Sequence, residues 1–331
     1  MASPPLIWAL TDDRAGNTAQ VLGVVEALNL PVMIKDVRYN VLSKLPSAFT
    51  GANAYTLVTE SRKALEACLP GLAPDIVISA GRRTAPIARW IKRRALKPIL
   101  LIHLMYPPSG VWDFDFIIVP NHDRLPSGGD RENIMRITGA PHQVTADHLN
   151  LAEENWKTQL GGIPRPFIAL LMGGSTHSKT FPPKRVGEFG RAVYRMAAEV
   201  GGSILLTTSR RTGVASEKAL DEAIPEPRQA FFWSRGGENP YMGFLALADA
   251  IVVSGDSVSM CSEACATPAP VYIYAPDDIT TPKHRRLHQE LYKLGLARPF
   301  LGRFDNWAHK PLNSSVEIAS AINDLIDRRV K

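Results

Sequence analysis

The segment 250–275, AIVVSGDSVSMCSEACATPAPVYIYA, constrains the fold most because it reads as strand, turn, helix and strand. The runs at 250–253 and 270–274 are apolar and rich in β-branched or aromatic residues, as is typical of strands buried on both faces. Between them, small, hydroxylated and acidic residues at 254–260 predict a tight turn and the start of a helix. The segment therefore predicts a βαβ unit of a parallel sheet.

The turn of this βαβ unit carries residues that suit a ligand. Asp256 or Ser257 can cap the helix, and the free N–H groups of its first turn suit an anion such as a phosphate. Glu263 lies one helical turn beyond Ser259 on the same face, where a carboxylate can accept hydrogen bonds from the vicinal diol of a ribose. The same residues also suit an ordinary cap and the helix macrodipole, so the residues alone leave both interpretations open.

Composition indicates two globular domains. A chain of 331 residues suits two domains of roughly 150 residues each, and 45% hydrophobic with 21% charged residues is typical of globular proteins. No apolar run approaches the ~20 residues that span a bilayer, and the first residues lack the basic region of a secretory signal, so we expect a cytoplasmic protein. Cys68, Cys261 and Cys265 lack the neighbours of a metal site and are expected to be buried.

Predicted strands and helices alternate along the chain, which predicts α/β architecture with doubly wound parallel sheets. A cluster of Gly and Pro at 161–166 predicts the boundary between two domains. We therefore expect an N-terminal domain over 1–160 and a C-terminal domain over 161–311. A terminal helix within 312–331 is expected to pack back on the N-terminal domain.

Two further loops of the second half follow predicted strands. The backbone amides of Gly173, Gly174 and Ser175 suit a phosphate, although an ordinary turn between strand and helix fits this sequence equally well. Arg210 and Arg211 have planar guanidinium groups that suit a diphosphate unless they only face solvent. Both loops should lie at the carboxyl edge of the sheet, where open α/β sheets bind ligands.

Residues 82–97 hold seven basic and no acidic residues. With Ile87, Trp90 and Ile91 on one face, this stretch predicts a basic amphipathic helix. Such a helix can bind an anionic membrane surface, which would place the protein peripherally at the inner face of the membrane. The outer helix of an α/β domain gives the same pattern. Nucleic acid is not an expected partner, because neither interleaved aromatic residues nor a known binding motif accompanies the charge.

Six motifs together resemble the mitochondrial fission (elongated mitochondria) family over nearly the whole chain. They are TDDRAGNTAQ at 11–20, SAGRRTAP at 79–86, VPNHD at 119–123, MGGS at 172–175, LTTSRRT at 206–212 and DSVSMCSEA at 256–264. The family comprises plant proteins and bacterial homologues. A chain of this length without an added targeting sequence resembles a bacterial member.

The segment 250–275 is also similar to the donor-binding unit of two-domain GT-B glycosyltransferases. This resemblance implies two Rossmann-like, doubly wound parallel-sheet domains that face each other across a cleft. It implies that Ser257, Ser259 and Met260 meet the diphosphate of a nucleotide-sugar, most simply UDP-linked, and that Glu263 holds its ribose. The implied function is inverting, metal-independent glycosyl transfer. A nucleotide-sugar epimerase and a non-catalytic, membrane-associated scaffold are the alternatives.

The same resemblance assigns the acceptor to the first domain. Gly16 and Asn17 parallel the acceptor-side loop of GT-B enzymes, where a glycine lets the backbone approach a substrate. Gly81 and Arg82 end a predicted strand and start a helix, which makes them a second candidate for binding an anion.

An inverting transfer needs a general base beside the acceptor hydroxyl. The candidates are the side chains at predicted strand ends, namely Asp13, His122 and Asp123. If backbone amides and arginines neutralise the leaving diphosphate, no metal is required. The acidic pairs of the chain are adjacent residues and do not form the DxD pattern of a metal-bound nucleotide, so we predict neither a metal nor another cofactor.

Overall fold

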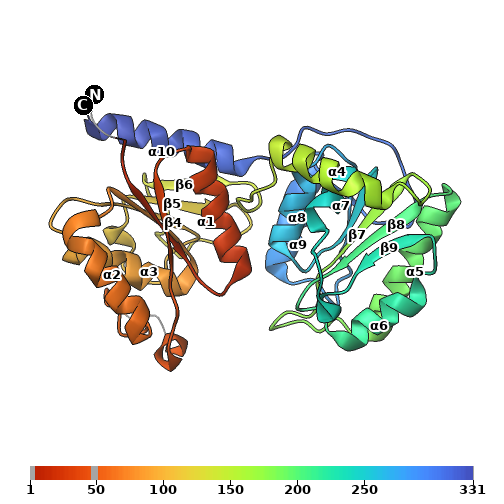
Figure 1. The fold of residues 1–331 in the computed structure, drawn as a ribbon, viewed down its shortest axis with the longest axis horizontal. Coiled ribbons are helices and arrows are strands. Elements are labelled where there is room, and N and C mark those ends of the chain that lie inside the picture. Colours follow the sequence, from red (N-terminus) through yellow and green to blue (C-terminus); the bar gives the residue numbers. More distant parts are fainter. Residues whose placement is uncertain (1–3, 46–50, 331) are drawn as a thin grey trace. The chain divides into compact units, whose positions relative to one another are not determined.

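The computed structural model describes residues 4–45 and 51–330, without the side chains of the last two of these. The chain forms two compact units (Figure 1). The first comprises Met1–Gln143 with Ser314–Lys331, and the second comprises Val144–Asn313.

The first unit is one parallel sheet covered by helices on both faces. Its strand order is β2-β1-β3-β4-β5-β6. The strands are β1 (Ile7–Thr11), β2 (Val32–Asp36), β3 (Ile76–Ala80), β4 (Leu100–Leu104), β5 (Phe116–Pro120) and β6 (Ile134–Ile137). The helices are α1 (Ala15–Leu28), the 3-10 turn η1 (Val41–Lys44), α2 (Thr59–Leu72), α3 (Gly81–Arg94), the 3-10 turn η3 (Val111–Asp113) and α10 (Ser314–Val330).

The second unit repeats this architecture with the strand order β12-β11-β10-β7-β8-β9. Its strands are β7 (Phe167–Met172), β8 (Ser203–Thr208), β9 (Arg228–Phe231), β10 (Ala250–Ser254), β11 (Val271–Tyr274) and β12 (Arg298–Pro299). Its helices are α4 (Ala146–Leu160), α5 (Pro183–Glu199), α6 (Val214–Ala223), the 3-10 turn η4 (Trp233–Arg235), α7 (Tyr241–Leu247), α8 (Val258–Cys265) and α9 (Pro282–Lys293).

The central strands are buried on both faces because their side chains alternate between two separate cores. In β7, Ile168 and Leu170 pack with Phe189 of α5 on one face, while Ala169 and Leu171 pack on the other face. Continuous apolar runs are what such a doubly covered parallel strand requires. The expectation for the cysteines is confirmed on α8, where both are buried, whereas the cysteine of α2 is only partly buried.

Two helices decide where the units divide. α10 packs along α1, where Ile318 and Ile322 enter the core of the first unit (Figure 1). α4 instead packs against α7, with the Trp156 ring 6.3 Å from that of Phe244. The division therefore falls before α4, between 143 and 144, and not at the Gly and Pro cluster that follows this helix. No helix in the described part of the chain is long and apolar enough to cross a membrane.

In each sheet the strand order reverses direction at one point, between β1 and β3 in the first unit and between β7 and β10 in the second. Loops that leave the carboxyl ends of the two strands at such a point diverge to opposite faces, and ligands of open α/β sheets bind in the crevice this creates. We therefore expect ligand sites at the loops after β1 and β3 in the first unit, and at those after β7 and β10 in the second.

Candidate functional site

The turn between β10 and α8 forms one side of the reversal point in the second unit. Ser257 caps α8, and its Oγ accepts a hydrogen bond from the Met260 amide at 3.4 Å. Residues 257–260 are all partly exposed. The first N–H groups of a helix have no partner within the helix, and here they lie in a turn that solvent reaches. This geometry suits an anion at the start of α8.

A buried carboxylate ties three strand-end loops together beside this turn. The Asp256 side chain is 2% exposed, and its Oδ2 accepts a hydrogen bond from the Gly174 amide at 2.9 Å. The same oxygen lies 2.7 Å from Nη1 of Arg211, which also donates to the Gly174 carbonyl at 3.1 Å. Asp256 therefore links the loops after β7, β8 and β10.

The glycines after β7 serve close packing. The Gly173 amide donates to Oγ of Ser254 at 2.7 Å, and a Cβ at this position would lie 2.3 Å from the carboxylate of Asp256. A Cβ on Gly174 would lie 2.1 Å from the carbonyl oxygen of Arg211. Both amides already have partners inside the protein, and the Ser175 hydroxyl accepts from a neighbouring amide at 3.0 Å. The Gly173 and Gly174 amides are therefore not free for a phosphate, and their loop packs against the loops after β8 and β10.

The two arginines after β8 differ in their surroundings. Arg211 is held by Asp256, as described above. Arg210 is exposed and makes no hydrogen bond or ion pair with the described residues. Of the two predicted diphosphate ligands, Arg210 is the one whose guanidinium is available.

Glu263 lies on α8 and is partly buried, and its Oε2 accepts a hydrogen bond from the Tyr241 hydroxyl at 2.5 Å. Burial raises the pKa of Glu263, while the bond from Tyr241 acts in the opposite direction. Burial also raises the pKa of Tyr241. Sequence reasoning missed Tyr241, because its approach to Glu263 depends on how α7 packs beside α8 and no local pattern encodes that.

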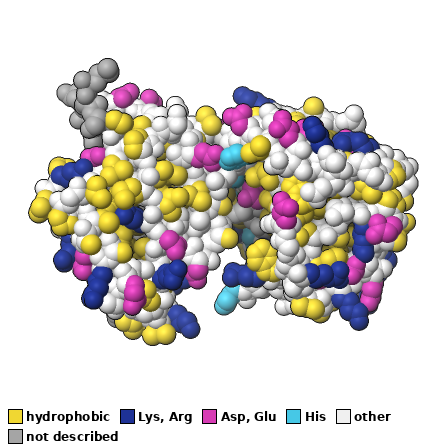
Figure 2. All heavy atoms as spheres, viewed as in Figure 1, with side chains coloured by type: hydrophobic (Ala, Val, Ile, Leu, Met, Phe, Trp, Pro, Cys, Tyr) yellow, Lys and Arg dark blue, Asp and Glu magenta, His cyan; other side chains and the backbone are white. Residues whose placement is uncertain are grey.

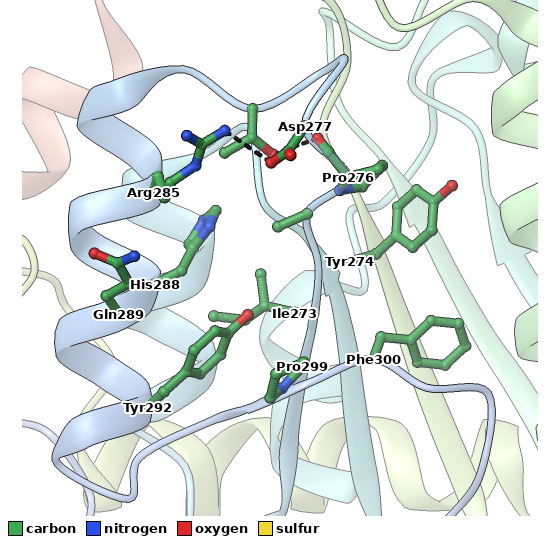
Figure 3. Close-up of a pocket in the computed structure, with 12 residues that line it drawn as sticks. Ile273, Tyr274, Pro276, Asp277, Arg285, His288, Gln289, Tyr292, Pro299 and Phe300 are labelled. Atoms are coloured by element: carbon green, nitrogen blue, oxygen red, sulfur yellow. Dashed lines mark hydrogen bonds and ion pairs between the residues drawn. The ribbon is translucent and has the colours of Figure 1, made fainter.

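A cavity of about 430 Å³ lies between β11, β12 and α9 (Figure 3). His288 and Tyr292 project from α9 toward β11, and an ion pair of 2.7 Å joins Arg285 to Asp277 at the other end. His288 is 3% exposed, and burial lowers its pKa to about 4. A Cβ on Gly255 would lie 2.6 Å from Cε1 of His288, so this histidine packs directly under the turn that leads into α8.

The reversal point of the first unit carries an acidic and basic cluster. Arg83 of α3 pairs with the buried Asp12 at 2.9 Å and also with Asp13, and its guanidinium lies 4.6 Å from the centre of the Tyr39 ring. The Asp13 side chain is 76% exposed, and its hydrogen bond with Arg83 lowers its pKa. A cavity of about 570 Å³ lies beside Asp13 and Arg83.

The acceptor-side residues also meet at this point. Gly81 has φ +79°, and a Cβ there would lie 2.7 Å from Nδ2 of Asn17, so these two predicted residues are neighbours. Gly16 is exposed in the first turn of α1. Arg82 does not present its guanidinium to an anion, because it donates to the carbonyls of Leu45 and Ser43 at 2.8 and 3.1 Å.

The three candidate bases do not form one cluster. Two strands separate β1 from β5, and with about 4.8 Å between neighbouring strands their ends lie roughly 14 Å apart. His122 is buried, with 1% exposure, and Asp123 is partly exposed in the loop after β5. Asp13 alone among the three is exposed at the reversal point. Within the described ranges, no group of three or more His, Cys, Asp or Glu side chains is placed to hold a metal ion.

Acidic partners neutralise most of the charge of the basic stretch 82–97, which forms α3 and the residues after it. Ile87, Trp90 and Ile91 of α3 are buried in the core of the unit, so the apolar face is covered. Most of the basic residues pair with acidic ones: Arg83 with Asp12 and Asp13, Arg89 and Arg93 with Asp113, Lys92 with Asp115, Arg94 with Glu66 and Lys97 with Asp75. Figure 2 accordingly shows basic and acidic side chains interspersed on the visible face of this unit. The geometry favours an ordinary outer helix.

Sequence comparison identifies the family. Residues 15–326 match the family described as Mitochondrial fission ELM1. The chain belongs to this family. Over 271 residues it is 28% identical to mitochondrial fission protein ELM1 of Arabidopsis thaliana. The aligned region covers 75% of this chain and 63% of that protein, so this chain spans less than two thirds of that relative's length. It is 27% identical to protein RP120 of Rickettsia prowazekii (strain Madrid E), with 96% of this chain and 97% of that protein covered.

This ELM1-family chain also resembles solved structures over its whole length. UDP-GlcNAc 2-epimerase from Methanocaldococcus jannaschii gives a TM-score of 0.60 at 14% identity, covering 97% of this chain and 99% of that one. A complex of that epimerase with UDP-GlcNAc and UDP gives a TM-score of 0.53, with the same identity and coverage. The glycotransferase of kitacinnamycin gives 0.53 at 13% identity with 100% of both chains covered. The likeness confirms the predicted fold, two Rossmann-like domains of the GT-B type.

Proposed function

We propose that this ELM1-family protein binds a UDP-linked nucleotide-sugar at the carboxyl edge of its second sheet and transfers the sugar without a metal. One observation carries the proposal: the Glu263 carboxylate lies one turn beyond the accessible start of α8, beside the point where the strand order reverses. A helix start suits the diphosphate, and a carboxylate at this distance suits the ribose. Structural neighbours that carry UDP-GlcNAc and UDP support this class of ligand.

In this proposal the diphosphate occupies the first turn of α8. Ser257 orders the turn as its cap by accepting a hydrogen bond from the Met260 amide, and Ser259 supplies a backbone amide to the diphosphate. Arg210 supplies an exposed positive charge from the loop after β8, because none of the described residues pairs with its guanidinium. Together they offset the charge that develops on the diphosphate as it leaves.

We assign the acceptor to the first unit and the general base to Asp13. Asp13 is exposed beside the cavity of about 570 Å³ and is ionised at neutral pH, since Arg83 lowers its pKa. In an inverting transfer this carboxylate takes the proton of the acceptor hydroxyl while the hydroxyl oxygen attacks the anomeric carbon and the bond to the diphosphate oxygen breaks. We prefer Asp13 to His122 because His122 is buried.

A thermal-shift screen of nucleotides and nucleotide-sugars tests the binding step. A ligand at about a hundred times its dissociation constant adds roughly 2.7 kcal/mol to the stability of the folded protein, which shifts its Tm by several degrees. We expect UDP and a UDP-sugar to give such a shift and Glu263→Ala to reduce it strongly. Absence of a shift with every nucleotide would refute the proposal.

Incubation with a bound UDP-sugar, followed by NMR of the anomeric protons, tests the chemistry. We expect slow hydrolysis of the donor in the absence of an acceptor, and slower hydrolysis with Asp13→Asn. Interconversion of two sugars would instead establish an epimerase. An unchanged spectrum despite binding would favour the non-catalytic scaffold.

A further inference from the structure

Tyr241 and Glu263 meet at the proposed ribose site although they come from different helices. Tyr241 is the first residue of α7, and Glu263 lies in the middle of α8. The hydroxyl of Tyr241 donates a hydrogen bond of 2.5 Å to Oε2 of Glu263. An O–H to carboxylate bond of this length is among the stronger hydrogen bonds in proteins. The pair is therefore a firm constraint on where the carboxylate points.

Tyr241 is itself firmly held. Its amide donates to Oδ1 of Asn239 at 3.1 Å, which fixes the entry into α7. Two residues further along α7, Gly243 lies against Trp156 of α4 so closely that a Cβ would be 2.4 Å from Cγ of the indole. α7 is thus anchored from both sides, and the Tyr241 hydroxyl has a defined position.

The bond leaves most of the carboxylate available. An ionised carboxylate offers about four lone-pair positions on its two oxygens, and Tyr241 uses one of them. Oε1 of Glu263 and the second lone pair of Oε2 can therefore accept two hydroxyl protons. A glutamate that is already fixed loses less conformational entropy when a ligand binds, so the hydrogen bonds contribute more to affinity.

We propose that Tyr241 is a positioning residue that fixes Glu263 to accept the 2′,3′-diol of a ribonucleoside diphosphate, which makes the site select ribose over sugars that lack the diol. The inference rests on the proposed nucleotide-sugar function and names its ligand class more closely. Tyr241 acts through Glu263 and is not expected to contact the reacting atoms.

Calorimetric titration of the full chain with UDP and with 2′,3′-dideoxy-UDP tests this inference. We expect the wild-type protein to bind UDP at least about tenfold more tightly, because the dideoxy compound leaves the partly buried carboxylate with only the Tyr241 hydroxyl as a partner. In Tyr241→Phe we expect this ratio to fall to about threefold or less, with UDP weakened and the dideoxy compound unchanged. Tyr241→Leu also lacks the hydroxyl and provides a second measurement if the first variant does not fold.

Tyr272→Phe is the matched control. Tyr272 is a buried tyrosine of the same unit, and its hydroxyl donates to the carbonyl of Asp305 at 2.6 Å and accepts from its amide at 2.8 Å. This variant also loses a bonded hydroxyl, but not at α8, so it should retain the wild-type ratio.

Three results would overturn the inference while leaving UDP binding intact. They are a wild-type ratio near one, a Tyr241→Phe variant that keeps the tenfold ratio, and equal weakening of both nucleotides in that variant, which a purely structural role would give. Failure of the wild-type protein to bind UDP at all would instead remove the proposed function and this inference together.

Discussion

Nη1 of Arg211 lies 2.7 Å from Oδ2 of the buried Asp256, and the same oxygen receives the Gly174 amide. The Asp256 carboxylate thus links the loops that follow β7, β8 and β10 at the edge where we propose that the second sheet binds its ligand. The arginine side chain is 36% exposed and can turn to water, whereas the Gly174 amide is buried. Loss of the carboxylate therefore affects the amide most.

We predict that Asp256→Ala lowers the free energy of unfolding by about 2 to 3 kcal/mol. The variant leaves a buried amide without an acceptor and a partly buried guanidinium without its counter-ion. Urea denaturation of the two proteins measures the difference. Asp277→Ala is the control, because Asp277 is 89% exposed in its pair with Arg285 and should contribute less than about 1 kcal/mol. Equal effects of the two substitutions would contradict the assignment.

Gly173→Ala should also destabilise the protein, by about 1 to 3 kcal/mol. The added methyl group would lie 2.3 Å from the carboxylate of Asp256, and relieving this overlap requires the loops to move apart. Gly162→Ala provides the comparison, since a Cβ there meets nothing within 4 Å. Thermal denaturation should separate the two variants by several degrees. A Gly173→Ala protein that melts with the wild type would show that this loop is not closely packed.

His288 should make the protein less stable as the pH falls from about 6.5 to about 4. In the unfolded chain a histidine binds its proton near pH 6.5, whereas burial lowers the pKa of His288 to about 4 in the folded protein. Between these values the unfolded state binds more protons, so the contribution of about 3 kcal/mol that is present at neutral pH is lost as the solution is acidified.

Urea denaturation at a series of pH values checks this prediction. His288→Gln should have a flatter stability profile than the wild type between pH 7 and pH 4. His177→Gln changes an exposed histidine and should follow the wild-type profile. Parallel profiles for all three proteins would mean that His288 titrates normally.

α3 should not bind membranes. Its apolar face is buried and its cations have acidic partners, so little net charge remains to attract anionic lipid. In flotation at low salt we expect equal recovery of the protein with neutral and with phosphatidylserine-containing vesicles. Association with the anionic vesicles that disappears in Arg93→Glu would restore the interpretation of this helix as a membrane-binding surface.

Local pattern was sufficient to predict two neighbouring strands of the second sheet. The runs expected at 250–253 and 270–274 agree with β10 and β11 to within one residue, because a doubly buried strand is a continuous apolar run that ends abruptly at polar loop residues. The same reasoning located the turn before α8. Resemblance to a known family then supplied the GT-B type, which periodicity alone does not specify.

Contacts between elements far apart in the sequence were not predictable in this way. The sequence suggested that Gly173 and Gly174 serve a phosphate, but the structure shows that they make room for Asp256 and Arg211, from loops that follow other strands. The contact between Tyr241 and Glu263 could not be predicted for a similar reason, since Glu263 lies on the next helix. In both cases the relevant neighbour is set by the packing of the unit, and the local sequence carries no mark of it.

α10 belongs to the first unit but follows the whole second unit in the sequence, so it is translated after that unit. Ile318 and Ile322 complete the apolar core against α1, yet they are translated only after the whole of Val144–Asn313. The second unit is continuous in sequence and can fold as soon as it has left the ribosome, whereas the first unit lacks part of the core around α1 until α10 has been translated. The nascent chain therefore exposes the apolar side of α1 for most of translation, and chaperone binding should concentrate there.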